Sequence, residues 1–188
     1  AKQIYEKYVE FFPATDNTAQ IRFSLAEIQF RQQAFVLSAE NYYKVYEDPR
    51  GGKLRKEGIR AALSALDQQL NIDRKKAGLT AINSHTTSKL ANKDDESLEL
   101  VPYSSIENRF IAISDEYLKA FATAKDAGDV LYEQAYLRYT HHDFNDAFKC
   151  FWTLVQKYPA HETAISSAYL ILDILNRRKE FPKLIRSE

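Results

Sequence analysis

The sequence predicts an all-α protein built as an α-solenoid of antiparallel helix hairpins, with an irregular helical insertion in the middle. Glycine and proline number only five each in 188 residues, so few residues interrupt a helix. A pattern of aromatic and small residues also recurs along the chain at constant offsets, which is typical of helical-repeat proteins. Hydrophobic residues make up 45% of the chain, enough to bury a core.

The clearest repeat relates residues 21–46 to residues 130–155 at an offset of 109. Small residues align with small ones, such as Ala26 with Ala135, and aromatic residues align with aromatic ones. Apolar positions in each half of the repeat lie three and four residues apart, as one buried helix face requires. Each copy is therefore expected to form two helices.

A third copy follows Pro159 at an offset of 146 from the first, and it aligns Phe35 with Phe181. A leading half-copy, residues 5–13, mirrors residues 151–159. The proline that closes each of these two segments is expected to end one unit, because proline disrupts a helix interior. One hairpin cannot bury its apolar face alone, so the units are expected to stack.

The stretch AYLRYTHHDFNDAFKCFWTLVQKYP resembles the tetratricopeptide-repeat family. The earlier copy is degenerate, with Ser38 in place of the usual alanine and Arg50 where a proline would fall. The resemblance covers residues 1–48 and 129–188, and it implies a fold more than a particular partner. The positions that carry it are Ala135, Tyr139, Phe144, Ala147, Phe151 and Pro159.

Two further strings, NRFIAISDEYLKAF and KYPAHETAISSAYLILDIL, are similar to long periplasmic tetratricopeptide proteins of predatory and gliding deltaproteobacteria. That similarity implies an envelope-associated scaffold of the gliding machinery in the periplasm, with the cytoplasm as the alternative location. The chain begins and ends inside expected helices. We therefore interpret residues 1–188 as a single helical-repeat domain cut from a longer protein.

Residues 49–128 interrupt the repeat and form the expected insertion. The apolar spacing over residues 53–76 predicts a helix, whereas residues 84–103 lose periodicity and predict an irregular loop. Long irregular loops in compact domains are often functional or disordered. The loop is thus either a solvated connection or a segment that engages a partner.

A second helix of the insertion is expected from Ser104 to about residue 125. Ser104 and Glu107 form a capping-box signature, and Gly128 is the expected stop. The chain should then contain about seven helices, with the central pair standing in for one repeat.

The sequence offers no convincing catalytic or metal site. His141 and His142 are adjacent, so on a helix they point about 100° apart, and no third ligand has suitable spacing. Asp143 is expected to be the N-cap of the helix that starts at Phe144. Cys150 lies between aromatic residues and is expected to be a small core residue.

Other classes of function are also disfavoured. Gly51-Gly52-Lys53 lacks the spacing of a phosphate-binding loop. The charges balance at 26 basic and 26 acidic residues, which argues against nucleic-acid binding. No apolar run approaches the roughly 20 residues of a membrane span, so we expect no membrane insertion by this piece. We therefore expect a non-enzyme without a cofactor.

The concave groove is the expected partner-binding site. In the resembled family the first helix of each unit lines this groove. We count from the reference residues Ala26, Ala135 and Leu172. The inward-facing residues are expected three positions before each reference residue and one, four and five positions after it. For Phe30 and Tyr139, packing between helices is an equally good interpretation. Tyrosine suits such a surface because it gives contact area and a hydroxyl that can stay hydrated. The expected set is Phe23, Glu27, Phe30, Arg31, Tyr132, Tyr136, Tyr139, Thr140, Tyr169, Asp173, Asn176 and Arg177.

These observations predict an adaptor or scaffold that holds a peptide or helix of another protein. Phe23 and Glu27 replace the lysine and asparagine with which the resembled family clamps acidic chaperone tails, so that partner is not expected. Two alternatives stay open. One is a helical domain of a larger enzyme, such as a peptidoglycan-acting one, and the other is a structural module that self-associates through its ends.

Overall fold

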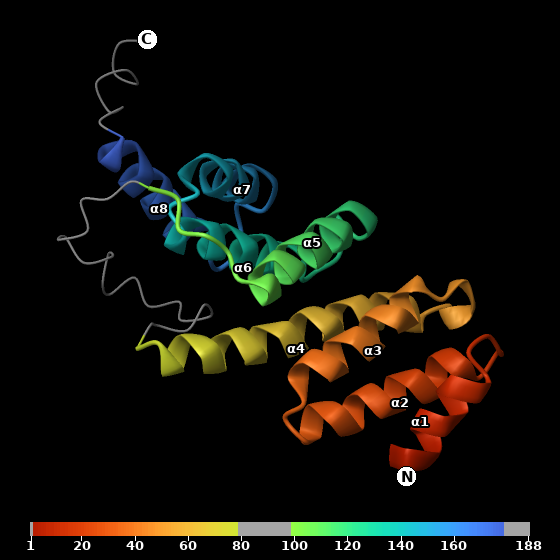
Figure 1. Cartoon of the computed structure of the whole chain (residues 1–188). Helices are drawn as coiled ribbons and strands as arrows, with labels where there is room; N and C mark the ends of the chain where they lie inside the picture. Colours follow the sequence, from red (N-terminus) through yellow and green to blue (C-terminus); the bar gives the residue numbers. More distant parts are fainter. Residues whose placement is uncertain (1, 79–98, 179–188) are drawn as a thin grey trace. The chain divides into compact units, whose positions relative to one another are not determined.

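The structure is a computed structural model that describes residues 2–78 and 99–178. Within these ranges it contains eight α-helices, one short 3-10 helix and no strand, which confirms the all-α class (Figure 1). The helices are α1 (Lys2–Phe11), α2 (Thr18–Arg31), α3 (Phe35–Glu47), η1 (Pro49–Gly51), α4 (Leu54–Lys76), α5 (Ser105–Ala120), α6 (Ala127–Thr140), α7 (Phe144–Lys157) and α8 (Ala164–Arg177).

Contacts divide the chain into two compact units. The first unit contains α1 to α4 and α5 from Arg109 onward, and the second contains residues 99–108 with α6 to α8. Most of the expected loop, residues 84–98, lies outside the described part, and so does the expected continuation of the third copy at Phe181.

The helix boundaries follow the offsets found in the sequence. An offset of 109 carries both ends of α2 onto both ends of α6, and an offset of 146 carries them onto both ends of α8. Each of the three helices is 14 residues long. The repeat in the sequence is thus also a repeat in local structure.

The turns recur as well. The α2–α3 turn contains Gln33 with φ 59°, and the α6–α7 turn contains His142 with φ 60°. Before α2, α6 and α8, the amides of Thr18, Ala127 and Ala164 each donate to the carbonyl three residues earlier, at 3.0 Å. The same two turn types therefore connect corresponding helices.

In the first unit, α3 and α4 approach closely at Gly58. A Cβ atom there would lie 2.7 Å from the backbone oxygen of Tyr42, so only glycine fits without a shift. The neighbouring residues Ile59, Ala62 and Leu63 are fully buried. The first unit also holds α5, because Tyr43 Oη donates to the Glu116 carboxylate at 2.8 Å.

The start of α5 confirms the expected capping box. Ser104 N donates to Glu107 Oε2 at 2.8 Å, and Glu107 N donates to Ser104 Oγ at 3.3 Å. The expected end of this helix is wrong, because α5 stops at Ala120 and Gly128 lies inside α6. The intervening residues 121–126 form the turn that also precedes α2 and α8.

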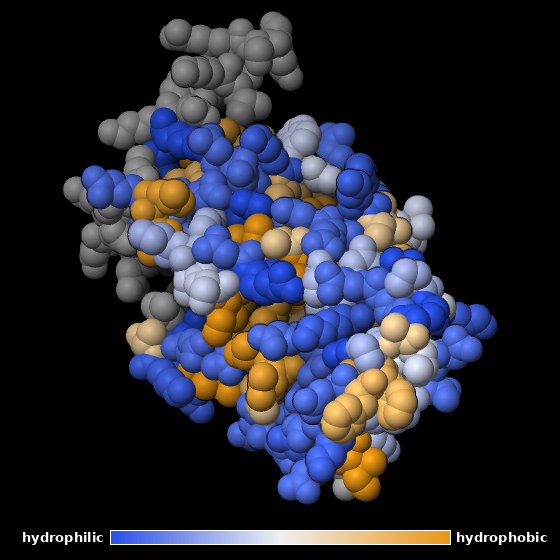
Figure 2. All heavy atoms as spheres, turned by 45° about the vertical axis from the view of Figure 1, so that its right-hand side comes forward, coloured by the Kyte–Doolittle hydropathy of each residue, from blue (hydrophilic) through white to orange (hydrophobic). Residues whose placement is uncertain are grey.

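Hydrophilic residues cover most of the surface in view, with apolar patches between them (Figure 2). Among the described helices, none has the length and apolar character needed to cross a bilayer.

Candidate partner-binding surface

The expected groove residues lie on the first helix of each hairpin. In the first unit, Phe23 packs edge-to-face on Tyr42, and Phe30 packs in the same way on Phe35, each with ring centroids 5.0 Å apart. Both rings belong to the contact between α2 and α3, although each stays partly accessible. On the same helix, Glu27 is half-buried and Arg31 is exposed.

In the second unit, Tyr132, Tyr136 and Tyr139 form a row of stacked rings along α6, with centroids 6.1 and 6.2 Å apart. Tyr132 and Tyr139 keep only 4% and 5% of their surface exposed, and both lie against Phe151 of α7. The expectation that Tyr132 faces a partner is therefore wrong, and for Tyr139 the alternative of packing between helices holds, because α7 packs over both rings. Tyr136 is half-buried and presents part of its ring.

Three of the expected site residues meet in one cluster. The Tyr139 hydroxyl donates to Asp173 Oδ2 at 2.5 Å, and Arg177 Nε donates to the same oxygen at 2.6 Å. Burial, followed by the hydrogen bond to Asp173, raises the pKa of Tyr139 above its usual range. The cluster joins α6 to α8, so it fixes the first helices of consecutive hairpins against each other.

The most accessible part of the expected site lies on α8. Tyr169 exposes 61% of its surface and follows Ile165 by one helical turn. Leu172 continues this apolar stripe. We call the accessible or partly accessible members of the expected set in the second unit the α6/α8 face: Tyr136, Thr140, Tyr169, Asp173, Asn176 and Arg177.

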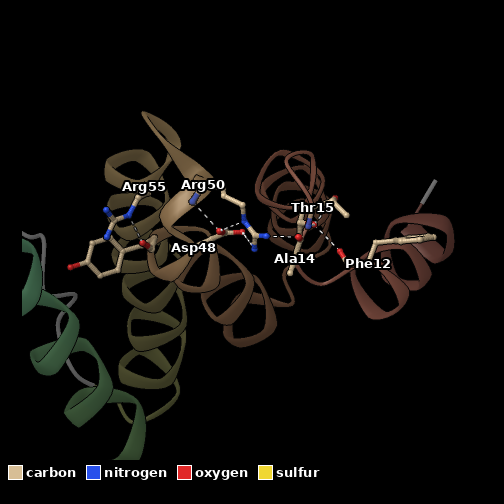
Figure 3. A network of polar contacts seen from close by, with 8 residues as sticks. Phe12, Ala14, Thr15, Asp48, Arg50 and Arg55 are labelled. Carbon is tan, nitrogen blue, oxygen red and sulfur yellow. Dashed lines mark hydrogen bonds and ion pairs between the residues drawn. The ribbon is translucent and has the colours of Figure 1, made fainter.

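Arg50 stands where the resembled tetratricopeptide family has a proline. It makes contacts that the sequence analysis did not predict. Its guanidinium pairs with Asp48 at 3.0 Å and donates to the backbone oxygen of Ala14, so it joins the turn after α3 to the turn before α2 (Figure 3). Asp48 also accepts the Arg50 amide, and these hydrogen bonds lower the pKa of Asp48. The two-residue spacing of Asp48 and Arg50 is the feature of the sequence that could have predicted this ion pair.

Ser38, the other departure, also has a partner. Its side chain is fully buried, and its hydroxyl donates to the Ala26 backbone oxygen at 2.8 Å. The serine is thus satisfied at a position where the later copy has the smaller Ala147.

The α6–α7 turn holds a cluster that was expected to be structural. His141 Nε2 lies 2.9 Å from Glu107 Oε1, and its Nδ1 lies 3.1 Å from the Val101 backbone oxygen. The ring of Tyr103 stacks on the His141 ring with centroids 4.5 Å apart. The two adjacent histidines therefore have different surroundings, since His142 Nδ1 lies 3.0 Å from the Glu99 backbone oxygen.

Asp143 occupies the expected N-cap position of α7, but its side chain does not cap the helix. Asp143 Oδ2 instead accepts from the Tyr103 hydroxyl at 2.9 Å and from Arg138 Nη1 at 3.2 Å. The expected capping interaction is therefore wrong. Burial and the hydrogen bond to Asp143 raise the pKa of Tyr103.

Cys150 Sγ lies 3.6 Å from Gln134 Oε1 on α6, in the contact between the two helices of a hairpin. Within residues 2–78 and 99–178, no group of three histidine, cysteine or acidic residues is placed to hold a metal ion. Gly51 is buried beside the backbone oxygen of Val45, where a Cβ atom would lie 2.8 Å away. Cys150 and Gly51 therefore both have a role in packing.

No protein-family model matches the chain, and no curated protein matches it.

Proposed function

We propose that the chain is a tetratricopeptide-like α-solenoid that acts as a non-enzymatic scaffold. Its α6/α8 face would hold a peptide or a helix from another protein, within an envelope-associated complex. The supporting observation is that α2, α6 and α8 share one length and are preceded by one turn type, as the first helices of stacked hairpins would be.

The chemistry of the α6/α8 face suits a protein partner. Tyr169 and Tyr136 offer aromatic surface with polar tips, and Arg177 supplies a charge that is oriented by its pair with Asp173 at 2.6 Å. Aromatic and arginine residues are the side chains enriched at binding hot spots. The hydrogen bond from Tyr139 to Asp173 joins α6 to α8, which favours a preformed surface over one that orders on binding.

The test is a selection of peptides from a displayed library on the purified chain, followed by affinity measurements on Tyr169→Ala and on Tyr136→Ala. We expect each change to weaken the selected peptides about tenfold or more, the cost typical of a hot-spot residue. Trp152→Ala is the matched control, because Trp152 is an accessible aromatic on α7, outside the α6/α8 face. The proposal would be contradicted if Tyr169→Ala and Tyr136→Ala kept their helicity and bound the selected peptides as tightly as wild-type protein.

A further inference from the structure

A short segment of the second unit is held on the α6–α7 turn. We call residues 99–104 the strap. The Val101 amide donates to the His141 backbone oxygen at 2.9 Å, and the Val101 oxygen faces His141 Nδ1 at 3.1 Å. One residue of the strap thus contacts both the backbone and the side chain of His141.

His141 has an acceptor in front of each ring nitrogen. The Val101 oxygen is a backbone carbonyl, and Glu107 Oε1 belongs to a carboxylate 2.9 Å from Nε2. Neither can donate a proton to the ring while Glu107 is ionised. A neutral imidazole carries one N–H, whereas the imidazolium carries two. Both contacts are therefore hydrogen bonds only when His141 is protonated.

The ionised state of Glu107 has a clear basis. Burial alone would raise the pKa of Glu107, but hydrogen bonds from His141 and Ser104 lower it to about 2. His141 and Glu107 are each 8% exposed, so water screens their attraction little. Above about pH 2 the carboxylate thus favours the positively charged form of His141.

The other charged and titratable groups around His141 are themselves paired. Tyr103 stacks on the ring and donates its hydroxyl to Asp143. Arg138 pairs with Asp143 at 3.2 Å and lies 3.6 Å from Asp146. His142 faces the Glu99 backbone oxygen. Within the described contacts, the charge of Arg138 is thus directed at two carboxylates, and Glu107 remains the carboxylate paired with His141.

We propose that His141 is a pH-sensitive latch that holds the strap on the α6–α7 turn while it is protonated and loosens the strap when it loses that proton. Histidine titrates between about pH 5 and pH 8, so the latch works near neutral pH. The Glu107 carboxylate is a stronger acceptor than a backbone carbonyl and keeps the Nε2 proton, so deprotonation removes the Nδ1 proton and leaves that lone pair facing the Val101 oxygen. One hydrogen bond is then replaced by repulsion, and the strap detaches more often as the pH rises.

The Val101 amide is a direct reporter, because it donates to the His141 backbone oxygen and so follows the attachment of the strap. The test is hydrogen exchange of the Val101 amide in the full chain from about pH 5 to about pH 8, with the rates corrected for the intrinsic pH dependence of exchange. We expect its protection to fall about tenfold or more over this range, since a hydrogen bond from a charged group is worth about that much. Protection that stays constant would overturn the proposal.

Nuclear magnetic resonance of the histidine rings tests the charge state without a substitution. At about pH 6 we expect protons on both ring nitrogens of His141, and we expect the Nδ1 proton to be lost in the same pH range in which Val101 loses protection. A neutral His141 ring at about pH 6, with Val101 still protected, would contradict the latch.

Two variants separate the latch from general stability. Glu107→Gln keeps an acceptor for the Ser104 amide and turns an amide NH2 toward His141 Nε2. A neutral His141 can then accept at Nε2 and keep its Nδ1 proton on the Val101 oxygen, so the loss of Val101 protection should disappear from this pH range. His161→Gln is the matched control, because His161 pairs with Asp129 at 3.2 Å and makes no described contact with the strap. The proposal fails if Glu107→Gln leaves the transition where it is in wild-type protein, or if His161→Gln abolishes it.

Discussion

Tyr139 is held by a hydrogen bond from its hydroxyl to Asp173 and by aromatic packing around its ring. The repeat register put Tyr139, Asp173 and Arg177 in one expected groove set without predicting a contact between them, and in the structure the three side chains meet. The register did not say how deeply the ring is buried. Depth depends on how closely the next helices pack, and Phe144 and Phe151 of α7 cover the Tyr139 ring.

Tyr139→Phe is expected to lower the free energy of unfolding by about 1.5 to 3 kcal/mol, the usual worth of a hydrogen bond to a charged group. The substitution removes the hydroxyl that donates to Asp173 at 2.5 Å and leaves the ring packing in place. Urea unfolding of the variant and of wild-type protein measures the difference.

Tyr136→Phe is the matched control for this prediction, since Tyr136 lies on the same helix and is only half-buried. We expect it to change the free energy of unfolding by less than about 0.5 kcal/mol. If the two variants lost equal stability, the Asp173 hydrogen bond would not be the stabilising feature of Tyr139.

At the scale of elements, the offsets 109 and 146 predicted the hairpins well, because the same small and aromatic residues recur wherever two helices pack. The end of α5 was misjudged for a specific reason. Phe121 continues the apolar face of the helix in sequence, yet it already belongs to the recurring turn, as Phe12 and Tyr158 do. Apolar spacing alone does not distinguish a last helical turn from a turn residue that packs against the helix.

Gly128 was misjudged for a similar reason, since glycine often ends a helix. Inside α6 it instead makes room for the ring of His161, which precedes α8. A Cβ atom at Gly128 would lie 2.6 Å from His161 Cδ2. The first hairpin already indicated that a small residue is needed inside the helix at this position, because the residue that corresponds to Gly128 there is Ala19.

Gly128→Ala tests this contact in a double-mutant cycle with His161→Ala. Alanine is favoured over glycine inside a helix by about 1 kcal/mol, but overpacking costs about 1 to 3 kcal/mol. We expect Gly128→Ala to destabilise wild-type protein and to stabilise the His161→Ala variant, as measured by urea unfolding. Because the obstacle is a side chain, removing it should rescue the substitution.

Gly58→Ala serves as the contrast, because the atom that a Cβ would meet there is the backbone oxygen of Tyr42 at 2.7 Å. No side-chain truncation removes that oxygen, so this substitution should stay destabilising in the His161→Ala background. Equal effects of Gly128→Ala with and without His161 would contradict the contact between Gly128 and His161.

For the whole molecule, the sequence predicted the helical class and the repeating local structure, since both follow from residue spacing. The division of the described chain into two compact units was not foreseen, because it depends on which contacts form across the insertion. Spacing within a helix carries little information about contacts between distant segments. The binding face stays a prediction for the same reason.

The stability of a helix against local opening depends on how much of it is buried, so it should vary along the chain. In the first unit, α1 has no buried residue, whereas α4 buries nine, among them Ile59, Leu63 and Leu66. We expect amides in α1 to exchange about a hundredfold faster than amides in the middle of α4, which corresponds to a difference of about 2.7 kcal/mol in opening free energy. Hydrogen exchange of the full chain at one pH measures this gradient. Equal protection of α1 and α4 would contradict this prediction. Burial would then not set the stability of each helix, and the unit would open as a single cooperative body.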